Sequence, residues 1–184
     1  MKHNNPTLSQ EQINFVMSLY FEGKFNEAIE EIKSLNANYP NVPLLFNLIG
    51  ACYRELGQLE GSLKMFQIAI DIKSDYAEAH FNLGHTYKEL GKIDESIESY
   101  RMAINIQPNY PDAYNNLGNI LKDDKKLLPE AIEHLEWAIA YNPEFAEAHN
   151  NLGLALSEFG RALDSIKSFK LAIMIKPDYD KAYF

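Results

Sequence analysis

Histidine and cysteine are the side chains of this sequence best suited to catalysis or metal binding, and neither is spaced for it. His85 and His134 fall within predicted helices, and no cysteine or carboxylate stands at a spacing that would complete a tetrahedral metal site. The single cysteine, Cys52, has no histidine at a catalytic spacing and is expected to fill a small core position. The sequence therefore predicts no catalytic residue, no metal, no cofactor and a protein that is not an enzyme.

Carboxamide side chains recur along the chain and offer a different chemistry, the binding of a polypeptide backbone. Asn14, Asn82, Asn116 and Asn151 occupy the same position in four of five copies of a repeated segment. Each carries two N–H donors and one oxygen acceptor, so a row of them can pair with an extended peptide of any sequence. The alternative is that asparagine suits an exposed helix face here, or packs between neighbouring helices.

The elements that must position these asparagines are copies of one segment. AEAHFNLGHTY at 77–87, PDAYNNLGNIL at 111–121 and AEAHNNLGLAL at 146–156 are near copies, and their starts lie 34 and then 35 residues apart. The register extends backwards to PLLFNLIGACY at 43–53 and to the more divergent SQEQINFVMSL at 9–19. A second apolar segment follows each copy and ends at a proline or its equivalent, so the repeated unit reads as a pair of helices.

These repeats resemble the tetratricopeptide repeat, whose pattern runs aromatic, Leu-Gly, Tyr, then Gly, Ala, aromatic, Ala and Pro. The third copy carries these positions as His80, Leu83, Gly84, Tyr87, Gly91, Ser96, Tyr100, Ala103 and Pro108. The resemblance implies an all-α fold, an α-solenoid of helix–turn–helix repeats that forms a right-handed superhelix. The phrasing NNLG is similar to bacterial arrays and to the superhelix of O-linked N-acetylglucosamine transferases.

The two glycine positions of the repeat have different physical reasons. Gly84 lies inside the first helix, where a missing side chain lets the second helix approach closely. Gly91 follows that helix, where a left-handed cap suits glycine. Eight of the nine glycines serve these two positions, so none is left to build a phosphate-binding loop.

The register divides the chain into an N-terminal tail at 1–8, five repeats at 9–179 and the start of a sixth, truncated repeat at 180–184. The five repeats are expected at 9–42, 43–76, 77–110, 111–145 and 146–179. The fourth lacks the turn glycine and carries one extra residue. A longer turn is therefore expected there, with Pro129 at the start of the second helix.

Positions 2, 6, 9 and 13 of each repeat share one face of the first helix, because they are four, three and four residues apart. The resemblance implies that this face lines a concave peptide-binding groove. The expected groove residues are Asn14, Leu48, Asn82, His85, Asn116, Asn119 and Asn151. The first half of the face is apolar and the second half acidic, although Lys88 or Lys122 could neutralise some of the acids. The predicted partner is a protein or peptide with apolar and basic segments.

One position of the second helices is apolar in successive repeats and suggests an interface outside the groove. It holds Ile68, Met102, Trp137 and Leu171. These side chains either pack between neighbouring second helices or form a convex apolar strip that binds a partner.

The last second helix suggests another interface, at the C-terminal face of the array. Ile166, Phe169 and Ile173 are expected to face water there, because each repeat buries its apolar side on the next. Self-association through this face is one prediction, and a cap formed by residues 180–184 is the alternative.

Net charge and composition limit the classes of partner. The formal net charge is −9, whereas nucleic acids and anionic membranes bind basic surfaces, so neither is an expected partner. No apolar run is long enough to span a bilayer, and the first ten residues lack the apolar stretch of a signal peptide. A single cysteine cannot form an intrachain disulfide, and a cytoplasmic location is expected.

Three functions follow from the sequence. The leading one is a protein- or peptide-binding scaffold that uses the concave groove. The second, by family analogy, is the substrate-presenting N-terminal arm of a longer enzyme such as a glycosyltransferase or sulfotransferase. The third is a self-assembling structural protein.

Overall fold

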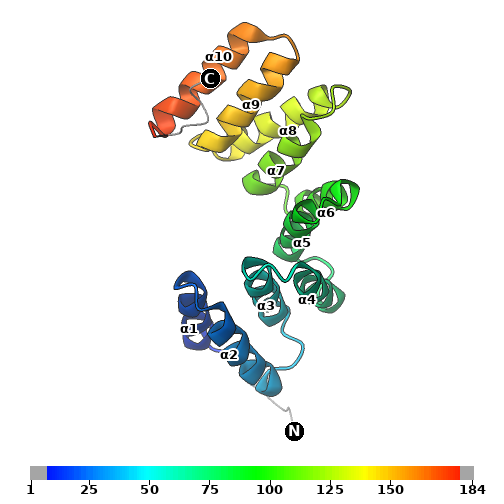
Figure 1. Ribbon diagram of the computed structural model, residues 1–184, viewed down its shortest axis with the longest axis vertical. Coiled ribbons are helices and arrows are strands. Elements are labelled where there is room, and N and C mark those ends of the chain that lie inside the picture. The colour runs from blue at the N-terminus through cyan, green and yellow to red at the C-terminus, as the bar shows by residue number, and fades with distance from the viewer. Residues whose placement is uncertain (1–7, 179–184) are drawn as a thin grey trace. The chain divides into compact units, whose positions relative to one another are not determined.

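The computed structural model describes residues 8–178, and this range is entirely helices and the turns between them. Its ten helices are α1 (Gln10–Phe21), α2 (Phe25–Asn38), α3 (Pro43–Glu55), α4 (Leu59–Ile72), α5 (Ala77–Glu89), α6 (Ile93–Ile106), α7 (Pro111–Leu121), α8 (Leu128–Tyr141), α9 (Ala146–Glu158) and α10 (Ala162–Ile175). Figure 1 shows them as successive hairpins along the chain. The all-helical prediction is confirmed, whereas the expected start of a sixth repeat at 180–184 lies outside the described residues.

The helices group into two compact units, Met1–Ser96 and Ile97–Phe184, and each is described by itself. Within unit 1, α1 packs on α2, α3 on α4, and each pair contacts the next first helix. Its first core cluster includes the fully buried Val16, Ile32, Leu45 and Cys52. An interlocking Ser9–Gln12 pair caps the start of α1, where each side chain bonds the other residue's backbone N–H.

Unit 2 repeats the same packing with its own side chains. Here α7 packs on α8, α9 on α10, and α8 contacts α9. One core cluster centres on Leu128, Leu135, Leu152 and Leu156. Within each unit, a first helix such as α3 or α9 packs on the second helix before it and on its own partner, so contacts on both sides fix its position.

Glycine inside the first helix sets the distance between the two helices of a hairpin. A Cβ built on Gly50 would lie 2.6 Å from the ring of Phe66, and one on Gly153 would lie 2.6 Å from the ring of Phe169. Neither contact is sterically possible without a shift, so the aromatic ring occupies the space of the missing side chain. Ser165 stands where the repeat pattern has alanine, and its hydroxyl donates to the Gly153 carbonyl at 2.7 Å.

The turn within the fourth repeat differs from the others, as the sequence predicts. Gly91 ends the turn after α5 with a φ of 72°, and only three residues separate α5 from α6. Between α7 and α8 the chain instead takes residues 122–127. The Asp124 carboxylate accepts the Lys126 backbone N–H at 2.9 Å and stabilises this longer turn.

Candidate binding surfaces of the two units

The first helices of unit 1 enclose a small cavity. It has a volume of about 130 Å³ and is lined by Met17, Tyr20, Asn47, Leu48, Ala51, Arg54, Glu78 and Asn82. These residues come from α1, α3 and α5, one helix from each of three successive repeats. Apolar side chains make up part of the wall and polar groups the remainder, which is the composition of a site for a mixed ligand such as a peptide.

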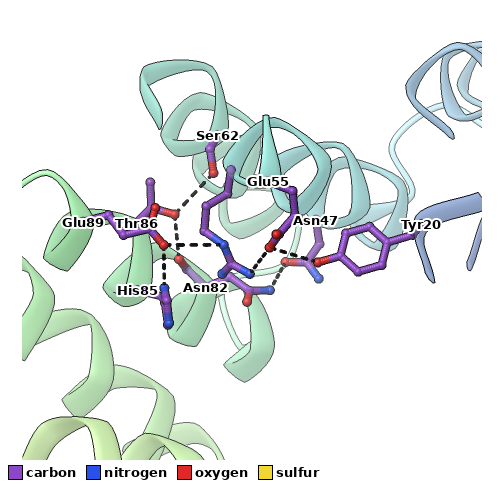
Figure 2. Close-up of polar contacts among 9 residues, drawn as sticks. Tyr20, Asn47, Glu55, Ser62, Asn82, His85, Thr86 and Glu89 are labelled. Carbon is purple, nitrogen blue, oxygen red and sulfur yellow. Dashed lines mark hydrogen bonds and ion pairs between the residues drawn. The ribbon is translucent and has the colours of Figure 1, made fainter. Parts of the chain in front are cut away.

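A pair of asparagines ties α5 to α3 at the edge of this cavity. The Asn82 amide donates to Asn47 Oδ1 at 3.1 Å (Figure 2). The Asn47 amide in turn donates to Glu78 Oε1 at 3.2 Å. Asn47 is 1% exposed and Asn82 is half-buried, so the bond between the two carboxamides is partly buried. One N–H of Asn82 therefore joins two first helices, which is the packing role that the sequence left open as an alternative. The Asn82 side-chain oxygen has no hydrogen-bond partner within residues 8–178.

A row of charged and polar groups continues from the cavity along the same face. The Arg54 guanidinium contacts Glu55 at 3.1 Å and reaches Glu89 at 3.9 Å. Tyr20 donates its hydroxyl to Glu55 at 3.3 Å, and His85 Nδ1 donates to Glu89 at 3.0 Å (Figure 2). One arginine therefore stands among two carboxylates, and α1, α3 and α5 are joined by polar contacts.

The charge state of this row follows from burial. Burial lowers the pKa of His85, and the neighbouring Arg54 charge lowers it further, although Glu89 opposes both effects. The imidazole is therefore neutral at pH 7. With one cation and two carboxylates, the row keeps a net negative charge that favours a basic group on a ligand.

Unit 2 contains the same carboxamide pair. Asn151 on α9 donates to Asn115 Oδ1 on α7 at 2.9 Å, and the two residues are 6% and 2% exposed. Each pair joins the sixth position of one first helix to the fifth position of the preceding first helix. The fifth-position partners, Asn47 and Asn115, were not identified from sequence. The available signal is that an asparagine directly precedes the sixth position in both repeats.

Unit 2 has a cavity beside the longer turn, and it is larger than the cavity of unit 1. Its volume is about 380 Å³, and it is lined by Lys122, Asp123, Lys125, Leu154, Ser157, Glu158 and Phe169. Asp123, Leu154 and Glu158 stand at positions 9 and 13, which the sequence places on the groove face, whereas Lys122, Lys125 and Ser157 were not predicted there. The signal for them is the departure of the fourth repeat from the common spacing, which places two lysines next to the face of α9.

The predicted groove residues fall into three groups. Leu48 and Asn82 line the unit 1 cavity, and His85 lies one turn further along α5. Asn116 and Asn119 are half-buried on α7 and do not line the unit 2 cavity. The remaining two are Asn14, which is exposed and accepts a bond from Gln10 at 2.9 Å, and Asn151, which belongs to the carboxamide pair.

Of the apolar residues at the recurring position of the second helices, Ile68 is half-buried and the other three are more exposed. Met102, Trp137 and Leu171 are 37%, 45% and 43% exposed. The Trp137 ring stacks on Tyr141 with centroids 5.8 Å apart and an interplanar angle of 24°. On α10, Ile166 is exposed, whereas Phe169 and Ile173, which were expected to face water, are half-buried, and the Phe169 ring lies against Gly153.

Neither the cysteine nor the acidic groups form a reactive site. Burial raises the pKa of Cys52 to about 11, so its thiol stays protonated at neutral pH. Across residues 8–178 no three His, Cys, Asp or Glu side chains gather closely enough to hold a metal ion. None of the helices in that range has the length and apolar character needed to cross a membrane.

Comparison with protein families gives matches over most of the chain. A profile described as "TPR repeat" matches residues 50–91, 84–125 and 124–160, and one described as "Tetratricopeptide repeat" matches residues 146–179. No curated protein matches the chain.

Several solved structures share the fold. The crystal structure of MamA has a TM-score of 0.76 at 24% identity, and the alignment covers 96% of this chain and 99% of that one. YrrB, described as a TPR protein with an unusual peptide-binding site, has a TM-score of 0.72 at 18% identity over 95% of this chain and 90% of its own. TTC0263, a thermophilic TPR protein of Thermus thermophilus, has a TM-score of 0.72 at 15% identity over 94% of each chain.

Proposed function

The chain belongs to the tetratricopeptide repeat family, and we propose that it is a peptide-binding scaffold whose unit 1 cavity holds an apolar side chain of the bound segment. The observation that carries this proposal is the arrangement of the cavity wall. Met17, Leu48 and Ala51 supply apolar contact, and the Asn82 side-chain oxygen and Arg54 guanidinium stand beside them.

The size of the cavity defines the ligand group. A volume of about 130 Å³ accommodates a side chain of leucine or methionine size, and burying such a group contributes roughly 1.5–3 kcal/mol. The Asn82 oxygen can accept one backbone N–H of an extended segment, because its amide is already directed to Asn47. The carboxylates of Glu55 and Glu89 favour a lysine or arginine further along the segment.

Family and structural likeness support the general class of ligand. Arrays of helical repeats present their extended faces to partners, and YrrB is described as having a peptide-binding site. The proposal gives no catalytic role to residues 8–178. In unit 2 the exposed Asp112 and Glu147 extend the preference for basic segments.

The test is selection of binders from a random peptide display library, followed by titration of the selected peptides. Selected sequences should share one aliphatic residue with a basic residue a few positions away. Ala51→Leu fills the cavity and should weaken binding about tenfold or more, since the anchor side chain loses its place.

The matched control is Ala37→Leu on the exposed surface of α2, which should bind as the wild type does. Peptides that bind both variants equally well would contradict the assignment of the unit 1 cavity.

A further inference from the structure

The carboxamide pairs follow a rule along the array, and the rule leaves one buried acceptor without a donor. In each pair, the sixth-position asparagine of a first helix donates to the fifth-position asparagine of the first helix before it. Asn150 holds the fifth position of α9. Its side-chain oxygen is buried and has no hydrogen-bond partner among residues 8–178, and the residue is only 3% exposed.

A buried carbonyl without a donor is unfavourable, because it has lost water and gained nothing in exchange. The two equivalent residues, Asn47 and Asn115, are equally buried and both are paired. A carboxamide N–H from the sixth position of a first helix packed on the α9–α10 face would satisfy Asn150 once its side chain turns outward, because its oxygen is covered in the single chain.

A donor of this kind stands on α1. Asn14 holds the sixth position of the first repeat, and it is exposed, whereas Asn151 at the same position is buried. Its oxygen accepts from Gln10, and its amide has no partner within the described part of the chain. Asn14 therefore presents the donor half of the pair, and Asn150 the acceptor half.

Apolar side chains on α1 and on α10 are exposed at positions where the other repeats bury them. Ile49, Leu83, Leu117 and Leu152 hold the seventh position of the later first helices and are at most 8% exposed. In α1 this position is Phe15, which is 52% exposed. On the opposite face, Ile166 of α10 is 50% exposed, whereas Ile29 and Ile132 at its position are 4% and 6% exposed.

We propose that a second copy of this chain docks head to tail, with α1 of one copy packed on the α9–α10 face of the other. Asn14 then donates to Asn150, and Phe15 and Ile166 are removed from water. Because this contact joins two different surfaces, each added copy exposes a fresh Asn150, and the assembly can continue past a dimer.

One residue of α1 opposes the contact and limits its strength. Glu11 stands at the third position, where Leu45, Ala79, Ala113 and Ala148 are at most 1% exposed. Burying its carboxylate costs free energy, so association is weak in the wild type. Replacing Glu11 with alanine restores the residue type that the internal contacts carry.

The first test is sedimentation velocity over a concentration series, using the full chain and a chain that ends after Asp178. The shorter form excludes competition from the residues that follow. The average mass should rise with concentration past that of a dimer. In Glu11→Ala the same rise should occur at a concentration at least about fivefold lower. A monomer at every concentration in both forms and in Glu11→Ala would overturn the proposal.

Variants of the two asparagines test the register. Asn14→Ala and Asn150→Ala should each weaken association about 2- to 10-fold, while Asn26→Ala on the exposed surface of α2 should leave it unchanged. Phe15→Ser removes an exposed side chain that the fold does not need, and it should weaken association further. Association that is indifferent to Asn14, Phe15 and Asn150 would overturn the proposal.

Mixing the two asparagine variants separates head-to-tail docking from a symmetric contact. The Asn14→Ala chain keeps an intact α9–α10 face, and the Asn150→Ala chain keeps an intact α1. Their mixture should form heterodimers at wild-type strength, and longer assemblies should appear only at the higher concentrations that either variant alone requires. A mixture that associates no better than the separate variants would exclude this contact.

Discussion

The asparagine side chains fall into two groups: those that join neighbouring first helices and those that remain available to a ligand. Their hydrogen bonds distinguish the two groups. Asn82 and Asn151 hold neighbouring first helices together, whereas Asn116 and Asn119 lie half-buried without a hydrogen bond to another described residue. A change in peptide binding on loss of Asn82 or Asn151 therefore mixes a lost ligand contact with altered packing. Asn116 and Asn119 are the better residues for testing ligand contacts alone.

Loss of the Asn151 side chain should destabilise the fold. Asn151→Ala leaves the buried Asn115 oxygen unpaired, and this should cost roughly 1–3 kcal/mol in the free energy of unfolding measured with urea. Asn119→Ala is the control and should change the free energy by less than about 0.5 kcal/mol. Equal losses for the two variants would mean that the pair contributes nothing.

The stability of the protein should fall as the pH is lowered, in part through His134. Burial lowers the pKa of this histidine in the folded protein, although Glu130 opposes the effect. The unfolded chain, with an ordinary pKa of about 6.5, then binds the proton more readily, so stability is lost as the pH falls below that value. His134→Gln removes this contribution.

Urea unfolding at pH 7.5 and pH 5.5 measures the effect. The drop in the free energy of unfolding between these values should be smaller for His134→Gln than for the wild type. Carboxylates away from His134, such as Asp164, whose pKa is lowered by its bond to Arg161, add a loss that both proteins share. An identical drop in the two proteins would contradict the assignment to His134.

At the scale of the helix, the close approach of α3 and α4 depends on Gly50. Gly50→Ala places a methyl group 2.6 Å from the Phe66 ring, which is fully buried and has no free space to move into. The variant should lose roughly 1–3 kcal/mol of stability. Gly61→Ala on α4 is the matched control, because its methyl group would lie 3.3 Å from the Tyr53 ring and improves helix propensity.

Thermal unfolding of both glycine variants measures whether the close approach of α3 and α4 requires glycine at position 50. The Gly50 variant should melt several degrees below the wild type, and the Gly61 variant close to it. A Gly50 variant as stable as the wild type would mean that the hairpin tolerates a wider spacing.

The apolar strip on the second helices can be examined through the single tryptophan. Trp137 is 45% exposed and lies on α8 beside Tyr141, so acrylamide should quench its fluorescence efficiently in the folded protein. An emission that is blue-shifted and protected from acrylamide at low protein concentration would show that the strip is already covered. A peptide that binds the unit 1 cavity should leave the quenching unchanged.

The repeat pattern predicts the helices well because each position has one physical reason. Gly91 must adopt a positive φ and Gly50 must be small, and both requirements are visible in the letters of the repeat. The cavities could not be predicted in the same way. They depend on which polar groups are already bonded, such as the Asn82 amide, and on the irregular turn at 122–127.

At the scale of the whole molecule, charge and repetition determine the kind of partner. The net charge of −9 disfavours nucleic acids and anionic surfaces and favours basic peptide segments. Each unit carries its own cavity, formed by α1, α3 and α5 in unit 1 and by the 122–127 turn, α9 and α10 in unit 2, so two segments of a ligand, or two ligands, have places to bind. Affinity that falls with added salt should accompany the basic preference.

The central claim is that the unit 1 cavity holds an apolar side chain of a bound peptide. A crystal structure of the chain with a library-selected peptide tests it most directly. The account predicts an aliphatic side chain between Met17, Leu48 and Ala51, with a peptide N–H donating to the Asn82 oxygen. A peptide bound on the strip around Trp137 instead, with the cavity between α1, α3 and α5 empty, would contradict it.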